Sequence, residues 1–179
     1  MTVLFFQPDQ TQPSGWDLTG WVSLHVDDSF ISCADGWIIT ELNKHVRMGE
    51  PELDTFTFSG VEFQTLFNKA GIPYAFVETQ EAYVAFLEEV AIDKARFEDP
   101  ESKASVAEVS GYRGSLGGLL WATNTYWALA LASSLHASKV ATLTTGDVAS
   151  LNKQIRRAKT LESPPIVHRR LRRPWRVMT

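Results

Sequence analysis

The stretch Trp21-Val22-Ser23-Leu24-His25-Val26-Asp27-Asp28-Ser29-Phe30-Ile31-Ser32-Cys33 decides the fold of the first part of the chain. Residues 21–26 alternate, which is typical of a strand with one buried face. Residues 29–33 resume a strand-like composition after the two aspartates. Two strands that flank a short acidic turn predict a β-hairpin with both carboxylates at its tip.

The segments on either side of this hairpin complete a β-rich region. Residues 1–20 are expected to be irregular, because positions 7–19 are rich in turn-forming residue types. After the hairpin, Asp35 is a candidate cap for a helix in which Ile38, Leu42 and Val46 lie on one face. Apolar and polar residues alternate again at residues 55–58, and the phase of this alternation changes at Ser59-Gly60. A turn near residues 69–71 and a short strand follow. Residues 21–78 are therefore predicted to be mainly β-structure with one helix.

From residue 79 the hydrophobic period becomes helical. Tyr83, Phe86, Leu87 and Val90 have the spacing of one helix face. Ser105-x-x-Glu108 and Thr144-x-x-Asp147 match capping boxes, each followed by apolar residues at helical spacing. These patterns predict helices over residues 79–160. A β-rich first half and a helical second half predict the α+β class.

The uncharged segment Gly114–Ser138 is long enough to span a bilayer. Its many small and polar residues favour two packed core helices interrupted near residues 123–125, so no membrane partner is predicted. Trp121 and Trp127 are then expected to lie in the core.

The charge distribution is uneven. The net charge is −4, but residues 153–179 carry +8 and the preceding residues −12. A basic end on an acidic chain is typical of a protein with a polyanionic partner. The alternative interpretation is a solvated tail, and residues 161–179 are expected to form such a basic, disordered tail. The single cysteine, Cys33, excludes an internal disulfide and favours an intracellular location, cytoplasmic or nuclear.

Asp27 and Asp28 are the candidate catalytic and metal-binding residues. Adjacent carboxylates repel one another unless a cation neutralises them, and carboxylate oxygens suit Mg²⁺. Aspartate is also common in turns, so the pair alone fits an incidental turn as well.

Several motifs, in order, resemble the reverse transcriptases of copia-type retrotransposons. His25-Val26-Asp27-Asp28 resembles the family's Tyr-x-Asp-Asp, and Phe58-Ser59-Gly60-Val61-Glu62-Phe63 its Phe-Leu-Gly-Ile-Glu-Ile segment. Gln80-x-x-Tyr83 and Tyr112-Arg113-Gly114-Ser115-Leu116-Gly117-Gly118-Leu119-Leu120 are similar to later motifs of the family. Thr125 and Leu129-Ala130 fit the frame of its Thr-Arg-Pro-Asp-Leu-Ala motif, although Tyr126-Trp127-Ala128 replaces Arg-Pro-Asp.

The resemblance implies an RNA-directed DNA polymerase, a nucleotidyltransferase of a retrotransposon polyprotein. Residues 21–78 would be a partial palm, and residues 79–160 a thumb-like region. Asp27 and Asp28 would hold Mg²⁺ or Mn²⁺ for two-metal nucleotidyl transfer. Phe58, Gly60, Val61 and Glu62 would form a primer grip that positions the primer end.

Basic residues of the thumb-like region would bind an RNA or DNA template–primer through its phosphates. These residues are Lys153, Arg156, Arg157 and Lys159. The resemblance places the fingers and an earlier palm aspartate before Met1. We therefore expect a truncated or degenerate fragment that is inactive alone and self-associates through an exposed palm edge.

Two alternatives remain open at this level. The chain could be a domesticated remnant that acts as a nucleic-acid-binding or protein-interaction module. It could also be an unrelated small α+β protein with an incidental Asp-Asp turn.

Overall fold

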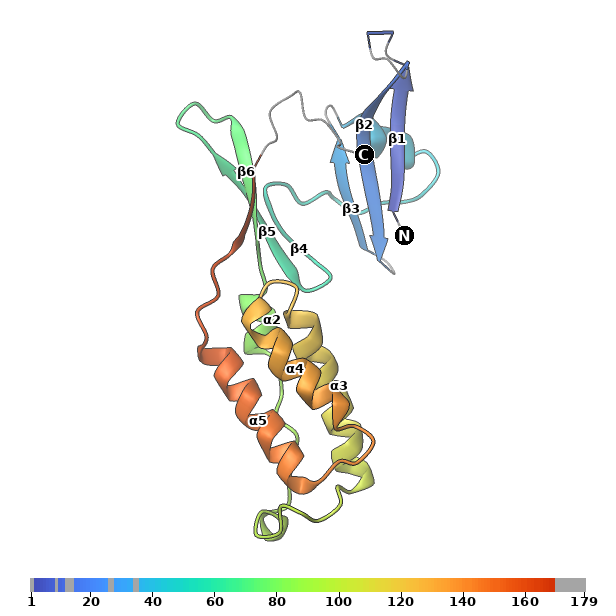
Figure 1. Cartoon of the computed structure of the whole chain (residues 1–179). Helices are drawn as coiled ribbons and strands as arrows, with labels where there is room; N and C mark the ends of the chain where they lie inside the picture. Colours follow the sequence, from blue (N-terminus) through green and yellow to red (C-terminus); the bar gives the residue numbers. More distant parts are fainter. Residues whose placement is uncertain (1, 9, 12–14, 26–27, 34–35, 170–179) are drawn as a thin grey trace. The chain divides into compact units, whose positions relative to one another are not determined.

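The computed structural model describes residues 2–8, 10–11, 15–25, 28–33 and 36–169 (Figure 1). The fold is α+β, with antiparallel sheets and several helices. The chain divides into two compact units, Met1–Ser59 and Gly60–Thr179. This boundary falls inside the segment 21–78, so the β-rich region predicted as one part belongs to two units.

Three antiparallel strands form the sheet of the first unit: β1 (Thr2–Pro8), β2 (Trp16–His25) and β3 (Asp28–Cys33), in that order. The predicted pairing of the two hairpin strands is confirmed, because His25 pairs with Asp28 and Val22 with Ile31. The turn residue Asp27 lies outside the described residues. β1 and the start of β2 lie where an irregular segment was expected. β1 and β2 pair with each other, from Thr2 with Ser23 to Pro8 with Trp16. Such cross-strand pairing can override a turn-rich local composition.

A short helix, α1 (Trp37–Leu42), packs on this sheet. A Cβ atom on Gly20 would lie 2.4 Å from Ile38 Cδ1 and 2.6 Å from the carbonyl oxygen of Ser32, so only glycine permits this close approach. The helix is shorter than predicted, and Val46, beyond its end, is exposed. The predicted cap, Asp35, lies outside the described residues. β4 (Thr55–Phe58) is the last element of this unit.

The second unit begins with β5 (Val61–Phe67) and β6 (Pro73–Thr79), joined by the predicted turn. In that turn the side chain of Asn68 accepts from the backbone nitrogens of Ala70 and Ile72, and Gly71 has φ +72°. β7 (Ile166–Arg169) pairs antiparallel with β6. Part of the segment 161–179 is therefore a strand rather than a disordered tail, because β6 supplies its hydrogen-bond partners.

Helices form the remainder of the second unit: α2 (Glu81–Ala85), η1 (Lys94–Arg96), α3 (Val106–Ala122), η2 (Trp127–Leu129), α4 (Ala130–Ser138) and α5 (Thr145–Thr160). Both capping boxes are confirmed at the starts of α3 and α5. α2 ends earlier than its periodicity predicted. Leu87 and Val90 are still buried, but from a non-helical segment, while Phe86 is 83% exposed.

Buried apolar side chains from α2, α3, η2 and α5 meet in one core. The helices α3, α4 and α5 pack side by side (Figure 1). The uncharged segment divides as predicted, since α3 ends at Ala122 and α4 begins at Ala130. The prediction that Trp121 and Trp127 are core residues is wrong, because they are 40% and 70% exposed. No helix among the described residues is both long and apolar enough to cross a membrane. The largest completely buried apolar residues of this helical core are Tyr112, Leu119, Leu129, Leu151 and Ile155.

Candidate nucleic-acid interface

Helix α5 carries the four basic residues that are predicted to bind nucleic acid: Lys153, Arg156, Arg157 and Lys159. Its N-terminus is closed by a reciprocal cap. The backbone nitrogen of Asp147 donates to Thr144 Oγ1 at 3.3 Å, and Asp147 Oδ2 accepts from the backbone nitrogen of Thr144 at 3.1 Å. The apolar residues of one side, including Val148, Leu151 and Ile155, are completely buried. The basic side chains therefore occupy the opposite, exposed side of the helix.

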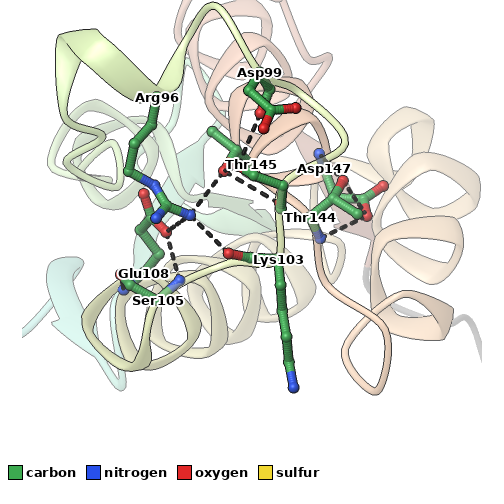
Figure 2. A network of polar contacts seen from close by, with 9 residues as sticks. Arg96, Asp99, Lys103, Ser105, Glu108, Thr144, Thr145 and Asp147 are labelled. Carbon is green, nitrogen blue, oxygen red and sulfur yellow. Dashed lines mark hydrogen bonds and ion pairs between the residues drawn. The ribbon is translucent and has the colours of Figure 1, made fainter.

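A polar network joins the beginning of α5 to the beginning of α3 (Figure 2). Arg96 Nη2 donates to the carbonyl oxygen of Lys103 at 2.7 Å and to Thr145 Oγ1 at 3.1 Å. The same nitrogen lies 3.2 Å from Oε2 of Glu108, a carboxylate that is only 4% exposed. The pairing compensates the cost of burying this charge. The network holds the N-terminal ends of the two helices together.

A second contact determines which side of α5 faces outward. Asn152 is buried, and its Oδ1 accepts from the backbone nitrogen of Val90 at 2.8 Å. Its Nδ2 donates to the carbonyl oxygen of Val90, also at 2.8 Å. Because both groups of the amide are occupied, rotation of α5 about its axis would leave buried polar atoms without partners.

The exposed side of α5 forms a groove with α4, with a volume of about 460 Å³. α4 contributes His136, and α5 contributes three basic residues and three polar ones. The groove thus brings together three of the four predicted nucleic-acid-binding residues; Lys159 is exposed but does not line it. The lining residues from α5 are Ser150, Lys153, Gln154, Arg156, Arg157 and Thr160.

The positive charges of the groove differ in how they are paired. Arg156 forms an ion pair with Glu89, so its charge is partly neutralised. Lys153 and Arg157, one helical turn apart, have no carboxylate partner within 4 Å among the described residues. The two unpaired cations attract an anion more strongly than Arg156 does.

His136 and Tyr112 form the polar contact beneath the groove. Tyr112 is completely buried, and its Oη donates to the carbonyl oxygen of His136 at 2.9 Å. Burial, with a smaller contribution from Asp147, raises the pKa of Tyr112 to about 12. Burial lowers the pKa of His136, and the negative charge of Asp147 opposes this effect. His136 is therefore mostly neutral at pH 7.

Of the predicted catalytic and metal-binding residues, Asp27 lies outside the described residues. Asp28 is exposed at the start of β3, where a groove of about 450 Å³ also contains Phe30 and Phe56. Within the described part of the chain, no group of three or more His, Cys, Asp or Glu side chains is arranged to hold a metal ion.

The four predicted primer-grip residues have structural contacts. The ring of Phe58 lies 5.7 Å from that of Phe30 within the first unit. Gly60 has φ +75°, as the predicted tight backbone requires, and a Cβ atom there would lie 3.0 Å from Tyr83 Cδ2. Val61 begins β5. Glu62 Oε2 accepts from the backbone nitrogen of Ala82 at 3.1 Å, which supports the start of α2.

Two motif residues of the resemblance meet in the core of the second unit. Gln80 is completely buried, and its side-chain amide hydrogen bonds with Thr125 Oγ1 at 2.9 Å. In the amide orientation that satisfies every neighbour, it also donates to the carbonyl oxygen of Ala122 and accepts from Trp121 Nε1. The Gln-x-x-Tyr and Thr motifs therefore form one buried polar contact across 45 residues of sequence.

Sequence reasoning missed four residues of the groove. Ser150, Gln154 and Thr160 share helical spacing with Lys153 and Arg157, and this spacing would have revealed them. No sequence signal identifies His136, because α4 reaches the groove only through packing against α5.

Comparison with known protein families, with curated proteins and with solved structures gave no match.

Proposed function

We propose that this chain is a degenerate relative of copia-type reverse transcriptases that binds nucleic-acid backbones through the α4/α5 groove. The observation that carries the binding proposal concerns Lys153 and Arg157 on the wall of this groove. Neither has a carboxylate partner in the part of the chain that the structure describes. The descent from reverse transcriptases is supported by the order of the motifs and by the contact between Gln80 and Thr125.

The dimensions of the basic side of α5 favour a polymeric anion. Lys153 and Lys159 are six residues apart, which corresponds to about 9 Å along a helix axis. A nucleic-acid strand presents one phosphate per roughly 3.4 Å in a B-form duplex, so this distance spans about three phosphates. A single small anion would contact only some of the basic side chains between Lys153 and Lys159.

The chemistry of the groove favours binding without sequence preference. Lysine and arginine contact phosphate oxygens irrespective of the base, and this interaction weakens with salt because counterions are released. Gln154 is the one amide side chain that lines the groove. One amide offers little base discrimination, so we expect similar affinities for different sequences of equal length.

The experiment measures fluorescence anisotropy of labelled dT20 with the full-length chain at several salt concentrations. Arg170, Arg172, Arg173 and Arg176 are first changed to glutamine, which gives the tail-neutral chain and removes their own attraction for the probe. In this background, Lys153→Gln/Arg157→Gln is expected to reduce the slope of log K against log [salt] by about 1.4, at roughly 0.7 for each lost phosphate contact.

The matched control is Lys94→Gln/Arg113→Gln. Both residues are exposed in the same unit and neither lines the groove, so the change in net charge is the same. We expect this control to bind dT20 almost as well as the tail-neutral chain. An equal loss in both double variants would mean that net charge, rather than the groove, causes binding.

A further inference from the structure

Among the described residues that line the α4/α5 groove, His136 is the one with an aromatic side chain. Its Nδ1 lies 3.2 Å from Tyr112 Oη, and the carbonyl oxygen of His136 accepts from the same hydroxyl at 2.9 Å. The side chain is half-buried, so one edge of the ring faces the buried tyrosine while the residue borders the groove.

These two contacts determine where the imidazole proton resides. A phenol has a single proton, and Tyr112 gives it to the carbonyl oxygen of His136. Toward Nδ1 the phenol oxygen is then an acceptor, so Nδ1 carries a hydrogen and donates it. The neutral ring therefore has its lone pair on Nε2. Protonation at low pH takes place at Nε2 without disturbing either contact to Tyr112.

The titratable groups around His136 come from α3, α5 and the end of α4. α3 contributes the neutral Tyr112, and α5 contributes Asp147 together with the cations Lys153, Arg156 and Arg157. η2 has no titratable side chain, and Lys139 follows His136 at the end of α4. Burial opposes protonation of His136, whereas the negative charge of Asp147 favours it. A phosphate in the groove would add a further negative charge that favours the protonated ring.

We propose that Nε2 of His136 is a proton-dependent phosphate contact of the α4/α5 groove, so that protonation strengthens the binding of nucleic acid. This inference rests on the proposed function, because it concerns the same groove. Binding and protonation are then linked reciprocally: acid strengthens phosphate binding, and bound phosphate favours the protonated ring.

The expected effect follows from one additional phosphate contact. Adding about 0.7 to the salt slope strengthens binding roughly fivefold at 0.1 M salt, since 0.1 M is a tenth of the standard concentration. The tail-neutral chain should therefore bind dT20 more tightly at pH 5.5 than at pH 7.5, by up to about fivefold when His136 is fully protonated. Thymine takes up no proton in this range, so the probe itself does not change.

The variant His136→Gln should bind equally at both pH values, while the matched control His45→Gln should keep the full pH dependence. His45 is exposed and belongs to the first unit. Equal pH dependence in His136→Gln and in the tail-neutral chain would overturn the inference. Loss of pH dependence in His45→Gln would overturn it as well.

A second measurement uses the unchanged histidine. NMR of the ring nitrogens should show hydrogen on Nδ1 of His136 at high pH, and addition of dT20 should raise the midpoint of its titration by about 0.7 pH unit. An unchanged midpoint with bound dT20 contradicts the inference. Failure of the proposed function is distinguishable, because Lys153→Gln/Arg157→Gln would then leave dT20 binding intact at both pH values.

Discussion

Asn152 and Val90, which are 62 residues apart, form a two-hydrogen-bond clamp between α5 and the segment after α2. The amide side chain satisfies both backbone groups of Val90 within the core. This clamp fixes the rotation of α5 about its own axis and hence the direction in which Lys153 and Arg157 point. The basic groove thus depends on a neutral amide on the other side of the same helix.

The first prediction concerns this clamp. Asn152→Ala leaves the buried N–H and C=O of Val90 without partners, so the free energy of unfolding should fall by about 2–4 kcal/mol. Urea denaturation measures this loss. Ser150→Ala, on the exposed side of α5, should stay within about 0.5 kcal/mol of the original chain. Similar losses of stability in the two variants would show that the two hydrogen bonds of the clamp do not contribute more to stability than an exposed serine.

The second prediction concerns the capping boxes. Ser105→Ala and Thr144→Ala each remove the side-chain acceptor at the start of a long helix, and each should cost about 1 kcal/mol. Arg96→Ala should cost more than either, because it leaves the buried carboxylate of Glu108 without its cation. Thermal unfolding followed by circular dichroism compares the three variants. Arg96→Ala with the smallest loss would contradict the interpretation of Figure 2.

The third prediction concerns alkaline pH. The pKa of Tyr112 is raised from 10.0 to about 12 by burial and, less strongly, by Asp147. Between pH 10 and 12 the unfolded chain releases this proton while the folded chain retains it, so stability falls as the pH rises. Over these two pH units the free energy of unfolding should fall by roughly 2–3 kcal/mol. Denaturation of Tyr112→Phe should show a weaker pH dependence over this range, although the variant is less stable at pH 7 because the hydroxyl bonds are lost.

The fourth prediction concerns the acidic hairpin. If the proposed relationship to reverse transcriptases is correct, Mn²⁺ should bind weakly at Asp27 and Asp28. NMR lines of His25, Asp28 and Ser29 should then broaden before those of other residues. Asp28→Asn should weaken this selectivity, whereas Glu101→Gln, an exposed carboxylate in the other unit, should not. Uniform broadening along the chain would exclude a defined site.

The fifth prediction is that this chain by itself does not extend a primer. Nucleotidyl transfer by two metal ions requires carboxylates that hold both ions in line with the reacting groups. Two adjacent carboxylates on one hairpin are a poor arrangement for this purpose. Primer extension on poly(rA)–oligo(dT) with Mg²⁺ or Mn²⁺ tests the expectation, with Asp27→Asn as the control. Extension that the control abolishes would prove the prediction wrong.

Local sequence was sufficient where a structure depends on neighbouring residues. The acidic hairpin, the Ser59-Gly60 backbone and both capping boxes were predicted and are confirmed. Their signals are alternation, glycine at positive φ, and a polar pair three residues apart. These interactions form within one strand pair or one helical turn, so the sequence displays them directly.

Contacts between distant segments decided the remainder. The strand β7 pairs with β6 across more than 80 residues, so it could not be recognised from its own composition. Phe86 matched a helical period yet is exposed, because α2 ends at Ala85. Trp121 and Trp127 lie on an uncharged segment that predicts core positions, whereas helix packing leaves both partly in solvent.

The sequence by itself determined the α+β class, the helix caps and the basic side of α5. These features depend on the hydrophobic period and the charge of residues that are close together in the sequence. The tertiary structure alone decided that His136 joins this basic row, and that Arg156 is paired with Glu89 while Lys153 and Arg157 are not. The physical reason is that pairing and burial depend on which side chains from distant segments come within a few ångströms of one another.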